Sequence, residues 1–299
     1  MSQFFIAAAH KSSGKTLVSS GLCAAYRRRG MRVAAFKKGP DYIDPAWLAR
    51  ASGRPCWNLD FFTMDHDEIH SCFEERRQDA DVAVVEGNKG LFDGLDVEGS
   101  DSNAALAVRL GLPVILVIDV TGITRGIAPL LTGYTGFDPD VQIAGVILNR
   151  VAGPRQESKL RAAIERYSDL PVLGAIGRTS GLGIEERHLG LVPGNEDPDA
   201  LARIDRIADV VEVGVDLDAL LALTADHQDP VATPSAMPSA LSSSKDRPVR
   251  IGIARDRAFG FYYPDDLAAF EQTGADLIPF DTLQDKNLPP LDGLFIGGG

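Results

Sequence analysis

The stretch that decides the fold is AAAHKSSGKT, residues 7–16, which follows a short apolar run. Its last three residues, Gly14, Lys15 and Thr16, are those that end a phosphate-binding loop of the form G-x-x-x-x-G-K-[ST]. In such a loop, backbone N–H groups surround the phosphates, the lysine reaches the β- and γ-phosphates, and the hydroxyl binds Mg²⁺. We therefore predict that this loop, including Ser12 and Ser13, binds a nucleoside triphosphate together with Mg²⁺.

The loop departs from the motif at its first position, where Ala9 stands in place of glycine. Alanine costs little at this position if its backbone φ angle is negative. Lys11 is either a second lysine over the phosphates or an exposed loop residue, and the sequence leaves both interpretations open.

Around the loop, apolar runs alternate with helical patterns through residues 1–220. Most runs are continuous, which is typical of a parallel sheet buried on both faces. A helix from about Thr16 to Arg29, ended by Gly30, joins the first two strands into a βαβ unit. We predict an α/β fold with a doubly wound, mostly parallel sheet. Its expected strands are Phe4–Ala8, Val33–Phe36, Val82–Val85, Val114–Val117, Ile143–Leu148 and Val172–Ala175.

The composition excludes several classes of function. The chain has 299 residues, 44% of them hydrophobic, and a formal net charge of −12, which argues against a nucleic-acid partner. No apolar run approaches the roughly 20 residues of a membrane span, and the N-terminus does not resemble a signal peptide. Cys23, Cys56 and Cys72 show no C-x-x-C spacing and indicate neither disulfides nor zinc. We expect a soluble cytoplasmic protein that does not bind membranes.

A second unit is expected beyond residues 228–248, a segment rich in proline and serine that is typical of a linker. Residues 249–299 contain three strand-like runs and a short helix, and end in GGG. A unit of about 50 residues that ends on a strand and a turn is too small for a complete fold. We therefore expect residues 1–227 to form one domain and Gly299 to be the end of a partial product.

Charged side chains follow two of the expected strands. Glu86 comes directly after a buried run, where a metal-binding carboxylate of a phosphate-loop protein would lie. Lys37, Asp41 and Asp44 belong to FKKGPDYIDP, residues 36–45, at the end of another strand. The carboxyl ends of parallel strands form the edge where doubly wound sheets bind ligands. This placement favours a functional site over a solvated polar loop.

Five segments, in this order and spacing, resemble those of cobyrinic acid a,c-diamide synthases, which are glutamine-dependent amidotransferases related to dethiobiotin synthetase. The segments are SSGKT, FKKGPDYIDPAWL, VVEGNKGLFDG, IAGVILNRV and ERHLGLVPGNE. The resemblance covers nearly the whole chain and implies a dethiobiotin-synthetase-like domain followed by the start of a class I glutaminase-like domain. In the family the glutaminase cysteine lies beyond GGG. We therefore expect this chain to use free ammonia and to be unable to hydrolyse glutamine.

The resemblance implies that ATP phosphorylates a peripheral carboxylate of a tetrapyrrole, and that ammonia, normally derived from glutamine, converts the acyl phosphate into an amide. Lys15 and Mg²⁺ would stabilise the γ-phosphate. Thr16, Asp41 and Glu86 would hold the metal, and Lys37 would neutralise the substrate carboxylate.

The resemblance also assigns further contacts. Asp44 matches a position tied to catalysis, and Tyr42 and Ile43 match positions that contact the macrocycle. Asn149 resembles the residue that reads adenine in related synthetases, and a turn-forming asparagine at a strand end is the alternative.

The segment between Gly87 and Gly90 departs from the cobyrinate-type pattern, because Asn88 and Lys89 stand where small or apolar residues are usual. This variant resembles relatives thought to amidate sirohaem. Lys89 is either a contact for an anionic substrate or a solvated loop lysine. The sequence leaves cobyrinic acid and a sirohydrochlorin-type ring both open as substrates.

Other classes of protein share parts of these features. A partitioning-type ATPase switch would carry its second loop lysine one residue before Lys11 and does not need GPDYIDP. Dethiobiotin synthetase lacks the linker and tail, and a non-catalytic scaffold that keeps the nucleotide-binding fold would be favoured if ATP failed to bind. His188 is expected to be structural or to line the substrate rather than to bind a metal. A homodimer is consistent with the fold family, but composition does not test it.

Overall fold

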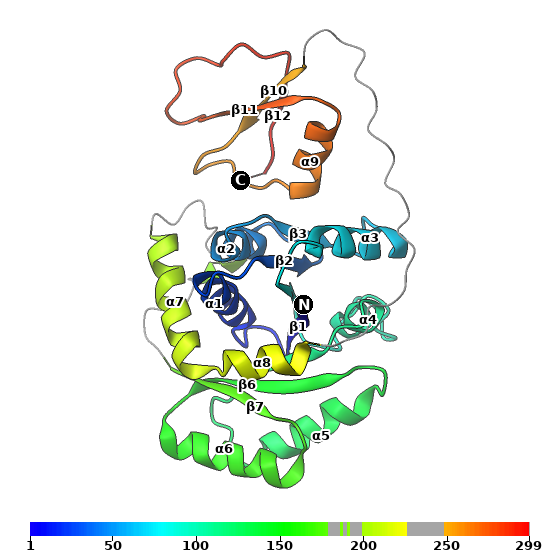
Figure 1. Cartoon of the computed structure of the whole chain (residues 1–299), viewed down its shortest axis with the longest axis vertical. Helices are drawn as coiled ribbons and strands as arrows, with labels where there is room; N and C mark the ends of the chain where they lie inside the picture. The colour runs from blue at the N-terminus through cyan, green and yellow to red at the C-terminus, as the bar shows by residue number, and fades with distance from the viewer. Residues whose placement is uncertain (179–185, 188–189, 192–198, 226–247, 299) are drawn as a thin grey trace.

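The structure, a computed structural model, describes residues 1–178, 186–187, 190–191, 199–225 and 248–298. Its main part is a seven-stranded parallel sheet in the order β3-β2-β4-β1-β5-β6-β7, with helices on both faces (Figure 1). The predicted α/β fold with a doubly wound parallel sheet is therefore confirmed. Of the linker predicted at 228–248, only residue 248 is among the described residues, so the division into domains stays a prediction. His188 lies outside the described residues.

The strands of this sheet are β1 Ser2–Ala8, β2 Val33–Lys38, β3 Cys56–Leu59, β4 Val82–Glu86, β5 Val114–Asp119, β6 Ile143–Val151 and β7 Val172–Gly177. The helices that cover it are α1 Lys15–Arg28, α2 Ile43–Ser52, α3 His66–Arg77, α4 Asn103–Arg109, α5 Ile127–Phe137, α6 Pro154–Tyr167, α7 Ala200–Gly214 and α8 Leu217–Thr224. A short antiparallel pair is formed by β8 Glu186–Arg187 and β9 Gly190–Leu191.

Two apolar clusters lie on opposite faces of the sheet. One joins the sheet to α1, α2, α7 and α8, and the other joins it to α3, α4, α5 and α6. Alternate residues of a strand point to opposite faces, so each central strand contributes to both clusters. In β1, Ile6 belongs to the first cluster and Phe5 to the second. This two-sided burial explains why the strands read as continuous apolar runs.

All six predicted strands form, and each of them extends further than predicted. β2 continues through Lys38 and β4 through Glu86, so Lys37 and Glu86 lie within the sheet rather than after it. The sequence did not predict β3, because CWNL is short and contains a polar residue. It also did not predict α2, whose first turn contains Pro45, a position where proline loses no helical hydrogen bond.

The helix α1 begins and ends one residue earlier than predicted, with Arg29 as its C-cap. Gly30 follows with a φ of 80°, which is the left-handed conformation expected of a glycine after a helix. The helices in the described part of the chain all lack the length and hydropathy of a transmembrane helix.

The second unit contains the elements that the sequence predicts. They are β10 Arg250–Ala254, α9 Pro264–Gln272, β11 Asp276–Phe280 and β12 Gly293–Phe295. The strands form a parallel sheet in the order β11-β10-β12. In Figure 1 this unit lies beside α2 and α3, and α9 contacts β3.

Candidate active site

The loop between β1 and α1 has the backbone that phosphate binding needs. Gly14, directly before α1, has a φ of 91°, and a Cβ there would lie 2.1 Å from Nδ2 of Asn149. Conformation and space therefore both require glycine. The first turn of α1 contains no acidic residue, so its N-terminal N–H groups can attract an anion.

The departure at the start of the loop is tolerated, as expected for alanine with a negative φ. Ala9 is not among the described residues with positive φ, and its carbonyl oxygen accepts a hydrogen bond from Tyr134. Ser13 is buried and its hydroxyl donates to the carbonyl oxygen of His10 at 2.8 Å, whereas Lys11 and Ser12 are exposed. Buried hydrogen bonds thus hold the loop on its inner side, and residues 11–12 are exposed to solvent on its outer side.

A buried ion-pair network lies beside this loop. Lys37 on β2 and Glu86 on β4 are opposite each other in register, so their side chains share the face that α1 covers. Nζ of Lys37 donates to Oε1 of Glu86 at 2.9 Å and to the carbonyl oxygen of Gly87 at 3.0 Å. The hydroxyl of Thr16 donates to the same Oε1 at 2.9 Å. The carboxylate of Glu86 on β4 is therefore hydrogen-bonded both to Thr16, which follows the phosphate loop, and to Lys37 on β2.

The start of α2 adds two carboxylates to this network. Oδ1 of Asp41 accepts hydrogen bonds from the backbone N–H groups of Ile43 at 2.9 Å and Asp44 at 3.1 Å, which begins the helix. Its Oδ2 lies 3.8 Å from Nζ of Lys37. Oδ2 of Asp44 accepts from the same nitrogen at 2.6 Å. The start of this helix thus brings both aspartates of GPDYIDP close to the ammonium group of Lys37.

The charges in this network do not balance. Burial acts to lower the pKa of Lys37, but Asp44, Glu86 and Asp41 more than offset it, and this pKa is raised. Burial acts to raise the pKa of Asp44, but Lys37 holds it below its usual value. Burial raises the pKa of Glu86, which is fully inaccessible, and its Oε2 has no hydrogen-bond partner among the described residues. One lysine therefore faces three carboxylates.

Lys15 extends from α1 over the same region. Its Nζ donates to the carbonyl oxygen of Lys89 at 2.6 Å, whereas the side chain of Lys89 is exposed. Burial first, and then the nearby charge of Lys37, lowers the pKa of Lys15 to about 8. A lysine in this position is ready to gain an anionic partner.

Three buried asparagines hold the segments that meet here. Asn149 donates to the carbonyl oxygen of Ser13 at 2.8 Å. Asn103 binds the 87–90 segment through the carbonyl oxygens of Asn88 and Gly90, at 3.0 and 2.7 Å. Sequence reasoning missed Asn103, which the structure places at the start of α4.

The third of these asparagines, Asn58, was also missed. Its Nδ2 donates to the carbonyl oxygens of Gly39 and Asp41, each at 2.8 Å. For Asn149, bracing of the phosphate loop is what the structure shows, and adenine recognition stays a prediction.

The residues predicted to contact the macrocycle have other neighbours in this structure. The ring of Tyr42 stacks on Phe261 and Tyr263 of the second unit, with centroid distances of 5.4 and 4.3 Å. Ile43 is half-buried and packs against the apolar cluster on the α1 face. Their contact with a substrate stays a prediction.

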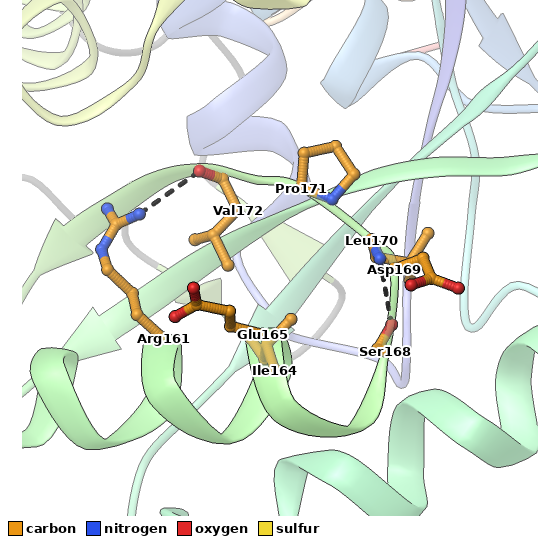
Figure 2. A pocket seen from close by; sticks show the side chains of 8 residues that line it. All are labelled: Arg161, Ile164, Glu165, Ser168, Asp169, Leu170, Pro171 and Val172. Atoms are coloured by element: carbon orange, nitrogen blue, oxygen red, sulfur yellow. Dashed lines mark hydrogen bonds between the residues drawn. The ribbon is translucent and has the colours of Figure 1, made fainter.

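A pocket of about 390 Å³ lies elsewhere, between the C-terminal turn of α6 and the start of β7 (Figure 2). It is therefore at the amino end of β7, whereas the phosphate loop follows the carboxyl end of β1. In Figure 2, Arg161 donates to the carbonyl oxygen of Val172 at 3.3 Å, and Ser168 accepts from the backbone of Leu170 at 3.1 Å. These bonds brace the end of the helix, and we assign the pocket no chemistry.

Comparison with known proteins places these residues in a family. The profile described as "CbiA: CobQ/CobB/MinD/ParA nucleotide binding domain" matches residues 4–192. A cobyrinate a,c-diamide synthase from Magnetococcus marinus is 51% identical over 304 residues, covering 99% of this chain and 64% of that protein. A protein of the same name from Listeria innocua is 40% identical over 301 residues, covering 100% of this chain and 66% of that protein.

The chain therefore spans less than two thirds of the length of these curated relatives. Among solved structures, chloroplast FtsY from Physcomitrella patens matches with a TM-score of 0.43 and 18% identity, covering 69% of this chain and 65% of that chain. This likeness is too weak to bear on function.

Proposed function

The chain belongs to the family of CobQ/CobB/MinD/ParA nucleotide-binding domains, and on this premise we propose that it catalyses the ATP-dependent amidation of peripheral carboxylates of cobyrinic acid. Similarity to cobyrinate a,c-diamide synthases along nearly the whole chain supports this choice of reaction. The observation that carries the proposal is the network of Thr16, Glu86, Lys37 and Asp44 beside the phosphate loop.

The donor set of this network fits Mg²⁺. All the candidate ligand atoms are hard oxygens, which this ion prefers, and Oε2 of Glu86 is buried without a partner among the described residues. Lys37 neutralises only one of the three carboxylates around it, and the remaining charge matches that of a divalent cation. Thr16 and Glu86 would hold the ion, with Asp41 as a further candidate. When bound, Mg²⁺ would neutralise charge on the β- and γ-phosphates.

The residues of the chain have separate roles in the proposed reaction. Gly14, Ser13 and Ser12 would cradle the phosphates through their backbone, and Lys15 would leave the carbonyl oxygen of Lys89 to bind the γ-phosphate. Lys37 and Asp44 would orient Glu86 and limit the repulsion that an approaching substrate carboxylate meets.

The proposed amidation takes place in two steps, formation of an acyl phosphate and its conversion into an amide. A substrate carboxylate oxygen attacks the γ-phosphorus, and the bond from that phosphorus to the bridging oxygen breaks, which releases ADP. Ammonia then attacks the acyl carbon and loses a proton, and phosphate leaves with the electron pair of the acyl–oxygen bond. In the proposed complete enzyme, ammonia would come from glutamine.

The substrate ring is tested by mass spectrometry with ATP, Mg²⁺ and ammonium, with cobyrinic acid and sirohaem offered separately. Each amidation lowers the oxygen count by one and adds one NH, so the product mass identifies the ring. We expect amidated cobyrinic acid and one ADP for each amide formed. Lys15→Ala should abolish turnover because it removes a charge aimed at the transferred phosphoryl group. Turnover that survives this change would contradict the proposed role of the loop.

A second candidate is the same reaction on sirohaem. The exposed side chain of Lys89, directly beside the carbonyl oxygen that holds Lys15, is the observation that favours it. Amidation of sirohaem alone would replace cobyrinic acid in the proposal. ATP hydrolysis without amidation of either ring would instead favour a partitioning-type switch, and failure to bind ATP would favour a non-catalytic scaffold.

A further inference from the structure

A second group of cations lies on the other face of β2 from Lys37. Lys38 is the last residue of this strand, and because strand residues alternate, its side chain points away from the ion-pair network. Its Nζ lies 5.7 Å from the centroid of Phe61, and the guanidinium of Arg109 lies 5.9 Å from the same ring. Two cations therefore contact one aromatic ring at the carboxyl end of the sheet.

Lys38 is unusual because it is only 5% exposed and yet has neither a hydrogen bond nor an ion pair among the described residues. Burial, first of all, lowers its pKa, and the charges of Lys37 and Lys89 act in the same direction. Asp101 and Asp60 act in the opposite direction but lie beyond ion-pair distance. Its Nζ is not among the buried side-chain atoms without a partner in the described part of the chain, so the stem of Lys38 is buried while its ammonium group reaches solvent and can meet a ligand.

The two nearby carboxylates are already occupied by the backbone. Oδ1 of Asp60 accepts a hydrogen bond from the N–H of Phe62 at 3.1 Å, and Oδ1 of Asp101 accepts from Leu95 at 2.7 Å. Each carboxylate thus shapes a loop and positions an exposed apolar side chain. Phe62 is 88% exposed and Leu95 is 85% exposed. Two exposed apolar residues are therefore tied by their backbone to the carboxylates whose charges act on Lys38.

We propose that Lys38, with Lys89 and Arg109, binds the carboxylates of the macrocycle that are not being amidated. This inference rests on the proposed function and deepens it. A polycarboxylate tetrapyrrole has an apolar ring face and a rim of carboxylates, and the described surface offers apolar side chains beside cations. Lys89 links this group to the active site, because its carbonyl oxygen holds Lys15 while its side chain stays exposed.

The chain itself carries a net charge of −12, so a polyanion must be attracted by a local group of cations. Lys89 and Arg109, like Lys38, have no ion pair among the described residues, so their charges are available to a ligand. An aromatic ring beneath two cations holds them without neutralising them. The group would thus orient the ring and select which carboxylate reaches the phosphate loop.

The test compares wild type with Lys38→Met, a change that keeps an unbranched side chain and removes the charge. Binding is measured by fluorescence quenching without ATP, using cobyrinic acid and, separately, cobinamide, in which amides replace the carboxylates. We expect Kd for cobyrinic acid to rise about tenfold or more, because a charge-assisted hydrogen bond is lost. Kd for cobinamide should change less than about twofold, and Lys38→Met should resist urea at least as well as wild type.

Two further variants complete the design. Arg109→Gln should raise Kd for cobyrinic acid about threefold, since this side chain is exposed. Lys159→Met, which removes an exposed charge on α6, is the matched control and should bind as wild type does. In turnover with ammonium, KM for cobyrinic acid should rise in Lys38→Met while KM for ATP stays the same.

The outcomes separate the inference from the function on which it rests. If wild type amidates cobyrinic acid and both Lys38→Met and Arg109→Gln bind it as wild type does, the inference is wrong and the function stands. Equal losses for cobyrinic acid and cobinamide would also overturn it, because the effect would then not come from carboxylates. Should wild type bind and amidate neither cobyrinic acid nor sirohaem, the proposed function itself falls.

Discussion

At the scale of single residues, Lys15 and Lys37 show how burial and partners set two lysines to opposite tasks. Both are buried at the same sheet edge, but Lys37 has carboxylate partners within hydrogen-bond distance and Lys15 has only a carbonyl oxygen. The pKa of Lys37 is therefore raised and that of Lys15 is lowered. One lysine is already paired, and the other is available for a phosphate.

The lowered pKa of Lys15 predicts that nucleotide binding takes up a proton. This pKa is about 8 without nucleotide, and bound phosphates would raise it. Affinity for ATP should therefore be constant well below pH 8 and fall as the pH rises through 8. Calorimetry of a non-hydrolysable ATP analogue at pH 9, in two buffers of different ionisation enthalpy, measures the proton count.

Lys15→Arg is the control for this titration, because a guanidinium stays protonated throughout the range. We expect proton uptake of a substantial fraction of one per site in wild type and none attributable to this position in the variant. Equal proton uptake in both proteins would show that another group titrates.

Removal of Lys37 should destabilise the fold. Lys37→Met leaves Glu86 and Asp44 buried without their cation, and breaking a buried pair in this way costs about 3 kcal/mol or more. The cost should be smaller at pH 5.5 than at pH 8, because at the lower pH the unpaired carboxyls, whose pKa values burial raises, can bind protons. Urea unfolding at both pH values tests this, with Lys159→Met as the exposed control. A loss independent of pH would argue against the carboxylates as its cause.

At the scale of elements, each of the meeting segments depends on a strand or helix end. The phosphate loop ends where α1 begins. Lys37 is the second-last residue of β2, and Asp44 lies in the first turn of α2. Parallel strands place all their carboxyl ends at one edge. Because β2, β4 and β1 are neighbours in the sheet, three segments distant in sequence meet there.

The junction of the loop and α1 predicts the effect of Gly14→Ala. Alanine is strained at a φ of 91°, and its Cβ would push on the amide of Asn149, which holds the carbonyl oxygen of Ser13. We expect affinity for ATP to fall about tenfold or more, since the loop backbone would shift away from the phosphates. Equilibrium dialysis with labelled ATP measures the change.

Gly30→Ala is the matched control for Gly14→Ala, because Gly30 has a similar φ of 80° and open space around its Cβ position. Both variants place alanine at a strained positive φ, but only Gly14→Ala brings its Cβ against Asn149 and disturbs the loop. The same loss of ATP affinity in both would mean that strain, and not the contact with Asn149, is responsible.

At the scale of the whole molecule, an aromatic stack joins the two units beside the candidate active site. Tyr42 precedes α2 and lies between Asp41 and Ile43, and its ring contacts Phe261 and Tyr263. Phe261 in turn pairs with Gly298 through backbone hydrogen bonds of 2.9 and 3.3 Å. The segment after β12 is thus connected to the start of α2 through Phe261, which bonds to Gly298 and stacks on Tyr42.

This arrangement predicts that Tyr42→Ala loosens the second unit. Each aromatic pair contributes about 0.5–1.5 kcal/mol beyond the burial of its area. We expect faster amide exchange in residues 250–298, measured by mass spectrometry, and an unchanged affinity for ATP. Tyr42→Phe keeps the ring and should exchange as wild type does. Unchanged exchange in Tyr42→Ala would mean that other contacts, such as that of α9 with β3, hold the unit.

The local pattern of the sequence was sufficient for most of the fold. Six strands of the main sheet, the helix after the phosphate loop and the elements of the second unit are found where the apolar runs and turn residues predict them. This succeeds because strand and helix periods act over a few residues and leave a direct trace in the chain. β3 and α2 were missed because their runs are short and interrupted by polar residues.

The sequence by itself singled out the residues of the candidate site, since G-K-T, Lys37, Asp44 and Glu86 stand out by their places at strand ends, and their chemical roles stay predictions. Only the tertiary structure decided what each one touches: that one lysine faces three carboxylates, that Lys38 lies against the ring of Phe61 with no ion pair among the described residues, and that Tyr42 stacks on the second unit. Those contacts depend on the order of strands and the direction of side chains, and neither leaves a trace in the spacing of residues along one chain.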